Sequence, residues 1–188
     1  MKKAQVYSEI LGDFILPLLG YLFWDWNLYF ILLFIIFDLS IRLIFSFLRK
    51  ESRSLQVLLR PSLFYIGFIV LSHFYIVLSD PTWRFTTAFS EFFWYEDFFI
   101  PQGLILVPIL IYTETTRQRF ELIAVGKYDA IQNTIKLGNR LLAGTILFML
   151  MSLILAFFNW SETFEITFFL SAWFVLIIYE NKATFKKD

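Results

Sequence analysis

Six long apolar stretches, separated by short polar pieces, constrain this sequence more than any other feature. The stretches cover residues 10–24, 28–48, 61–78, 98–112, 141–158 and 166–179. A membrane-spanning helix needs roughly 20 mostly apolar residues. Of the 188 residues, 59% are hydrophobic and only 17% are charged, so the chain is more apolar than an ordinary soluble domain. We therefore predict an all-α fold, a single polytopic membrane domain with six transmembrane helices.

The basic residues alternate along the chain in a way that predicts the orientation of these helices. The first, third, fifth and seventh polar pieces are basic, the second and sixth hold no Lys or Arg, and the fourth holds only Arg84. The positive-inside rule places basic pieces in the cytoplasm. We expect a multi-pass protein of the bacterial inner (plasma) membrane with both termini cytoplasmic. Lys2 and Lys3 precede an apolar stretch as in a signal peptide, but no cleavage pattern follows, so a retained first helix is expected.

Proline and charge refine the helix boundaries. Pro17 should kink the first span or free a backbone carbonyl, and Pro61 is expected in the first turn of the third span. The longest polar piece, residues 113–140, has loosely helical apolar spacing and is predicted to be a cytoplasmic helical segment. The first span is short; if it lies only in the interface, five spans remain and the N-terminal lysines fall on the opposite side.

The second span contains two charged residues that require an explanation. Asp38 lies near its middle, and Arg42 follows four residues later, so both side chains share one helix face and can pair. A lone charge at this depth costs a few kcal/mol, on the order of 3 kcal/mol, which pairing reduces in part. Two interpretations stay open: an internal clip that orients the helix, or a site for protons or ions.

Two further residues are candidates for an intramembrane polar site. Asp13 should lie at the depth of Arg42 on the neighbouring antiparallel helix, so an Asp13–Arg42–Asp38 cluster is sterically reasonable; alternatively, Asp13 reaches the membrane surface. His73, the only histidine, lies in the third span. It could relay protons, or hydrogen-bond a carbonyl or tyrosine hydroxyl between helices.

The basic piece after the second span offers candidate contacts for anionic lipid head groups. These candidates are Arg49, Lys50, Arg53 and Arg60. The positive-inside rule explains the same residues without a specific lipid. The chain has no cysteine and no recognisable catalytic motif, and its formal net charge is zero, so we predict no catalytic residue, no metal, no cofactor and no nucleic-acid partner.

The N-terminal part resembles a bacterial integral-membrane family of unknown function. The resemblance is carried by residues 16–24, which read LPLLGYLFW, followed by Trp26 and a long aromatic span. In that family a span similar to the third one carries His-Tyr-Gly and His-Gly pairs; here Tyr65, Gly67 and His73 are the counterparts, at different spacing. The resemblance covers about the first 75 residues and implies no activity.

Three functional hypotheses follow. Small size, short loops and bulky aromatic surfaces favour a non-enzymatic subunit or scaffold of a larger or oligomeric membrane assembly, in contact with lipids and with other subunits or further copies of the chain. A small channel or transporter would instead use Asp13, Asp38, Arg42 and His73 along its path. A membrane-embedded enzyme is the third and least favoured hypothesis.

Overall fold

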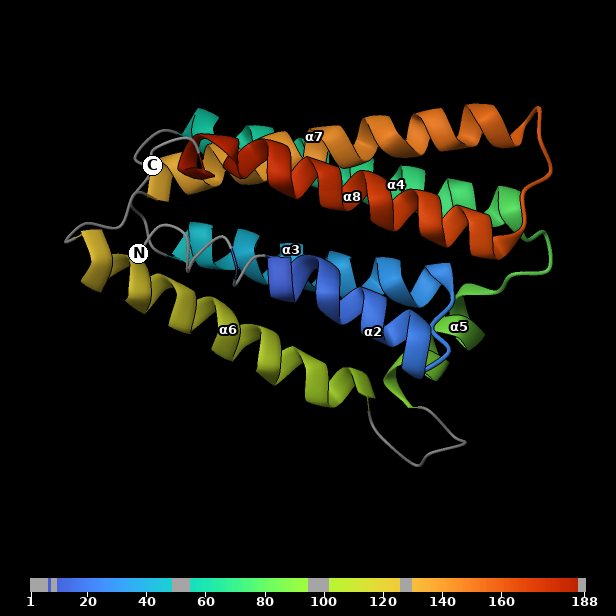
Figure 1. Ribbon diagram of the computed structural model, residues 1–188, viewed down its shortest axis with the longest axis horizontal. Helices are drawn as coiled ribbons and strands as arrows, with labels where there is room; N and C mark the ends of the chain where they lie inside the picture. The colour runs from blue at the N-terminus through green and yellow to red at the C-terminus, as the bar shows by residue number, and fades with distance from the viewer. Residues whose placement is uncertain (1–6, 8–9, 49–54, 95–101, 126–129, 186–188) are drawn as a thin grey trace.

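The computed structural model describes residues 7, 10–48, 55–94, 102–125 and 130–185, and all regular secondary structure within these residues is helical. A π-helical turn, η1 (Leu11–Ile15), continues directly into α2 (Leu16–Phe23). The remaining elements are α3 (Leu28–Leu48), α4 (Leu55–Ser79), α5 (Phe85–Phe93), α6 (Gln102–Val125), α7 (Ala130–Leu155) and α8 (Glu162–Phe185). The long helices lie side by side as one bundle (Figure 1).

Four of these helices are long and apolar enough to cross a membrane. They are Leu28–Leu48, Val57–Ser79, Ile131–Leu155 and Glu162–Asn181. Leu11–Phe23 is a shorter apolar helix, and α6 is charged in its second half. The helical class is thus as predicted, and the described residues support a membrane crossing for four of the six predicted spans.

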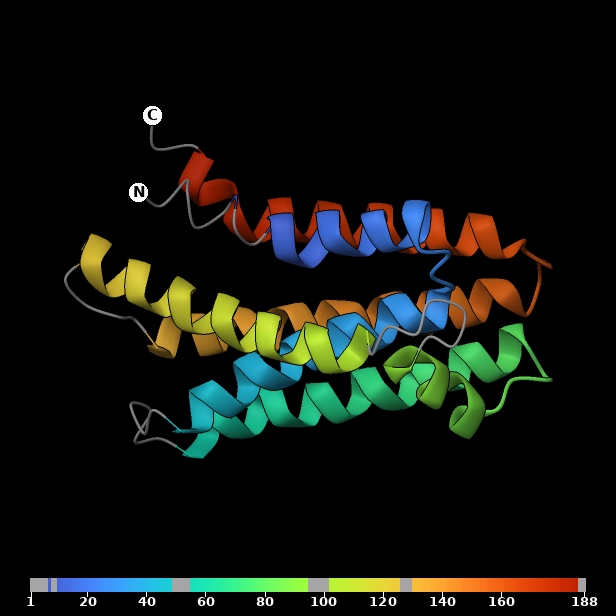
Figure 2. The same cartoon turned by 90° about the horizontal axis from the view of Figure 1, so that it is seen from below.

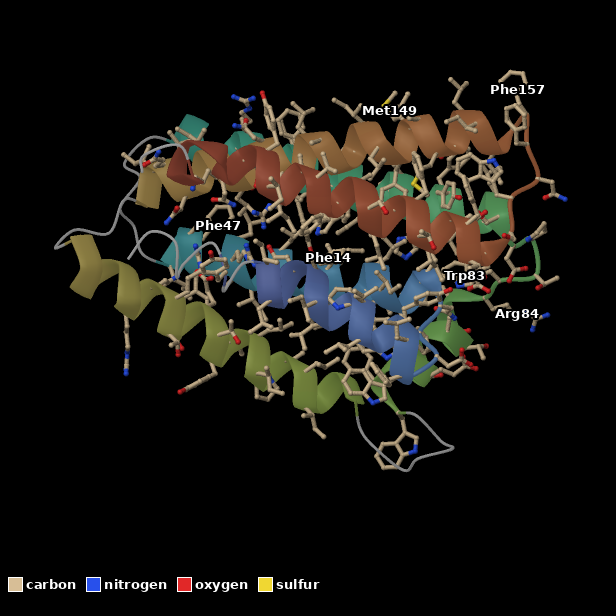
Figure 3. All side chains as sticks on the ribbon, viewed as in Figure 1. Phe14, Phe47, Trp83, Arg84, Met149 and Phe157 are labelled. Atoms are coloured by element: carbon tan, nitrogen blue, oxygen red, sulfur yellow. The ribbon has the colours of Figure 1, made fainter. Side chains whose placement is uncertain are left out.

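The helices run alternately in opposite directions along the bundle (Figures 1 and 2). At one end, which we call the basic end, α3 and α6 finish while α4 and α7 begin. The opposite end carries α5, Trp83 and Arg84 (Figures 1 and 3). The predicted segment 113–140 comprises the end of α6, residues 126–129, which lie outside the described residues, and the start of α7.

The third predicted span begins earlier than expected, because α4 starts at Leu55 and includes Pro61 in its interior. Proline removes one backbone hydrogen bond from a helix, yet the α4–α7 pair, the most extensive helix contact in the bundle, holds this segment helical. A Cβ built on Gly138 of α7 would lie 3.6 Å from the Cβ of Pro61. The two helices therefore meet closely at the proline, and tertiary packing overrides the local sequence signal.

Helix α3 forms the centre of the bundle. Every side chain from Leu28 to Ile36 is buried, and α3 contacts α2, α4, α5, α6, α7 and α8. Asn27 starts the helix by accepting a 2.9 Å hydrogen bond from the Phe30 N–H on its Oδ1. In the preceding turn Asp25 has a positive φ of 52°, which lets the buried Trp26 fold back over the preceding helix.

Trp26 covers Gly20, and only glycine fits beneath it. A Cβ at Gly20 would lie 2.3 Å from the Trp26 ring. The backbone N–H of Trp26 donates a 3.1 Å hydrogen bond to the Gly20 carbonyl. This contact fixes the α2–α3 hairpin. It therefore holds α2, and η1 before it, at a defined position along the axis of α3.

Candidate functional site

The π turn near the start of the chain places Asp13 inside the bundle. Pro17 has no N–H to bond the Asp13 carbonyl, and its ring crowds that carbonyl, so a regular α-helical turn is disfavoured here. The Leu16 N–H bonds the Leu11 carbonyl instead, closing the wider π turn. Asp13 itself is only 4% exposed. A kink or a freed carbonyl was predicted at Pro17; the structure shows a π turn just before it, and Asp13 within this turn is buried.

Asp13 bridges two arginines that come from different helices. Its Oδ1 accepts a hydrogen bond from Arg42 Nη2 on α3, and its Oδ2 accepts one from Arg140 Nη1 on α7. One carboxylate therefore links the N-terminal helix to two other elements of the bundle. Both interactions are charge-assisted, the strong class of protein hydrogen bond.

Each arginine also pairs with a second carboxylate. Arg42 Nη2 lies 2.7 Å from Asp38 Oδ2, one helical turn away, while Arg140 Nη2 lies 2.8 Å from Glu180 Oε2 on α8. The five residues form a continuous chain, Asp38–Arg42–Asp13–Arg140–Glu180, which we call the ion-pair network. It holds three carboxylates against two guanidinium groups and ties η1, α3, α7 and α8 together.

A second buried ion pair lies beside this network on α6. Glu114, 4% exposed, accepts two hydrogen bonds from Arg117, at 2.8 and 2.7 Å, and one of 2.6 Å from Gln118 Nε2. Burial alone would raise the pKa of Glu114, but the hydrogen bonds and positive charge of Arg117 hold it below its usual value. Glu114 is therefore ionised at neutral pH.

A small cavity separates Glu114 from the ion-pair network. Its charged lining comes from Asp13, Asp38, Arg42, Glu114 and Arg117. The space that the centre of a water molecule can occupy in this cavity is about 20 Å³, which leaves room for one or two water molecules. Water, or a proton carried by it, fits between the two clusters, whereas an organic substrate does not.

His73 lies away from this site. Its Nδ1 is 3.1 Å from the Ile69 carbonyl oxygen, to which it donates, and its ring meets those of Tyr29 and Trp83 edge-on at 6.1 and 5.8 Å between centroids. The structure therefore brings together Asp13, Asp38 and Arg42 but not His73. The alternative to a proton relay was a hydrogen bond between helices, but the carbonyl that His73 contacts belongs to its own helix, α4.

Of the predicted lipid contacts, Arg60 can be described, whereas Arg49, Lys50 and Arg53 lie outside the described residues. Arg60 is exposed on α4, and its Nη2 lies 3.4 Å from Asn139 Oδ1 on α7. Its guanidinium carbon lies 5.6 Å from the centre of the Phe64 ring. Arg60 is thus held at the surface of the α4–α7 pair.

Sequence reasoning missed Arg140 and Glu180. Each lies one residue outside a predicted span, at the start of residues 141–158 and the end of residues 166–179, and was counted with the polar pieces. The signal available was their position: the two residues flank consecutive antiparallel helices, so both fall at the same depth. Nothing in the spacing indicated that they would turn inward to meet Asp13.

The described residues contain no group of three or more histidines and carboxylates arranged to hold a metal ion. Comparison with protein-family models, curated proteins and solved structures found no match to the chain. The fold and the site therefore define the class by themselves: a helical bundle whose apolar helices are compatible with an integral membrane protein and whose interior holds a buried ion-pair network.

Proposed function

We propose that this protein is a non-enzymatic subunit or scaffold of a larger or oligomeric assembly in the bacterial inner membrane, with both termini in the cytoplasm. The observation that carries the proposal is the ion-pair network. Asp13 binds both Arg42 and Arg140, which come from two other elements, so these charges hold helices together. A network of this kind supports a structural role, in which paired charges fix the positions of the helices.

The outer surface of the bundle also supports a partner-binding role. Large apolar side chains recur along one face of α4 and are more than half exposed: Leu59, Leu63, Ile66, Val70 and Phe74. Met149 on α7 and Phe157 just beyond its end point away from the bundle (Figure 3) and are 57% and 76% exposed. Lipid chains or the helices of another subunit can cover these faces.

Two measurements test the proposal. A pull-down in mild detergent, read by mass spectrometry and by molar mass on a sizing column, should yield a stable partner or a defined oligomer. Because the chain has no cysteine, single cysteines at Val70 and Met149 can be crosslinked in membranes to find which face meets a second copy. A monomer without partner or crosslink would refute the proposal.

A small channel or transporter is the second candidate, and the cavity at Asp38 is the observation that favours it. Reconstituted vesicles carrying a pH-sensitive dye would show proton flux that is lost in Asp38→Asn. The double variant Asp38→Asn, Arg42→Met separates the two functions. If Asp38 and Arg42 only fix the positions of helices, the bundle should keep part of its stability, because both charges are removed together. If they form an ion site, the flux should be lost.

A further inference from the structure

A second cleft opens at the basic end, between α3, α6 and α7. The polar residues that line it are Arg42, Ser46, Arg117, Asn133, Lys136 and Arg140. Four of these six side chains are cationic, and none is acidic. The space that the centre of a water molecule can occupy is about 30 Å³, enough for a small tetrahedral group.

The carboxylates that hold the arginines do not line this cleft. Asp13 holds both Arg42 and Arg140, and Glu114 holds Arg117 through two hydrogen bonds. Positive charge therefore faces the cleft, while negative charge faces the interior of the bundle. The three guanidinium groups are fixed by these partners before any ligand arrives, so binding costs little side-chain entropy.

Lys136 differs from the three arginines in this cleft. It is partly buried on α7, and it makes no ion pair with another described residue. Its ammonium group is a compact donor that suits a phosphate oxygen. An anion in the cleft would thus meet one flexible cation and three fixed ones.

We propose that this cleft binds a phosphate group. Phosphate matches the four converging cations, since Arg binds its oxygens in forked pairs and Lys as a point charge. The position fits the head group of an anionic phospholipid, because α3 ends two residues beyond Ser46 and its last side chains, Phe47 and Leu48, are exposed apolar groups at the same end of the helix. A free phosphate ion shares the same chemistry.

The test is thermal unfolding of the full-length protein in neutral detergent, titrated with sodium phosphate, with dihexanoyl-phosphatidylglycerol or with dihexanoyl-phosphatidylcholine, at constant ionic strength. A saturable rise in Tm with both phosphate and phosphatidylglycerol is expected. A rise with phosphatidylglycerol alone assigns the site to a lipid head group, and one with phosphate alone assigns it to the free ion. No saturable rise with either, or an equal rise with phosphatidylcholine, overturns the proposal.

Substitutions in and near the cleft test whether the rise in Tm comes from binding there. Lys136→Gln should weaken the apparent Kd about tenfold, the effect of losing one charge-assisted contact, and Lys136→Arg should retain most of the affinity. Arg119→Gln is the matched control, since it removes one positive charge from an exposed position on α6 near the same end. Equal losses in Lys136→Gln and Arg119→Gln would show general charge attraction and refute the site.

Discussion

Replacing Asp13 by asparagine should destabilise the bundle more than replacing Asp38, because Asp13 binds two arginines in the ion-pair network and Asp38 binds one. The carboxylate accepts from Arg42 and Arg140 at once, whereas an amide has one acceptor oxygen, and its NH₂ group would face a guanidinium donor. Arg140 is 5% exposed and Arg42 is 13% exposed, so neither charge can recover full hydration. Each arginine keeps its second carboxylate, so the cost is that of two hydrogen bonds to charged groups, about 3–6 kcal/mol.

The comparison variant is Asp38→Asn, which leaves Arg42 bonded to Asp13. Its expected cost is roughly 1.5–3 kcal/mol, the value of one hydrogen bond to a charged group. Equilibrium unfolding in mixed micelles, followed by tryptophan fluorescence, would measure both free energies. Adding Arg140→Met to Asp13→Asn should deepen the loss, because the buried carboxylate of Glu180 then loses its ion pair with Arg140. If Asp13→Asn costs no more than Asp38→Asn, the bridging role of Asp13 is wrong.

Three further outcomes are expected. A Cβ at Gly144 would lie 2.8 Å from a buried phenylalanine ring of α4, so Gly144→Ala should cost about 1–3 kcal/mol in unfolding free energy; the control Gly67→Ala, whose Cβ meets its nearest atom at 3.5 Å, should cost less. Because the pKa of Glu114 is lowered in the folded protein, its contribution to stability is present above the unfolded pKa and is lost as pH falls through the folded pKa. Melting curves from neutral to acid pH should therefore show less acid sensitivity in Glu114→Gln, and an unchanged slope would contradict this. A cysteine introduced at Thr86 should react with an impermeant thiol reagent added outside intact cells, whereas one at Asn133 should not; the reverse pattern would overturn the predicted orientation.

The sequence was sufficient for those parts of the fold that depend on local composition. Long apolar runs identified α3, α4, α7 and α8, and the spacing of Asp38 and Arg42 predicted their pairing because residues four apart share a helix face. The predicted start of the third span near Pro61 was wrong. Proline is a local signal for the start of a helix, whereas the contact between α4 and α7 is made with residues far along the chain.

The candidate site was only partly predictable for the same reason. Asp13 could be placed near Arg42 from the antiparallel hairpin, which depends on a turn of a few residues. Arg140 and Glu180 reach Asp13 through the packing of α7 and α8 against the hairpin, and no local pattern encodes that packing. Their charges also resemble those of ordinary residues at the cytoplasmic ends of spans.

The ion-pair network has a consequence for biogenesis, because its members leave the ribosome at very different times. Asp38 and Arg42 can neutralise each other inside one helix as soon as that helix enters the membrane, and the hairpin then brings Asp13 to Arg42. Arg140 arrives much later in synthesis, and Glu180 only with the last helix. The N-terminal hairpin alone therefore holds two carboxylates against one guanidinium, and its final attachment waits for the C-terminal helices. The arrival of α8 supplies Glu180, so the same contacts that stabilise the finished bundle distinguish a chain that contains α8 from one that stops before it.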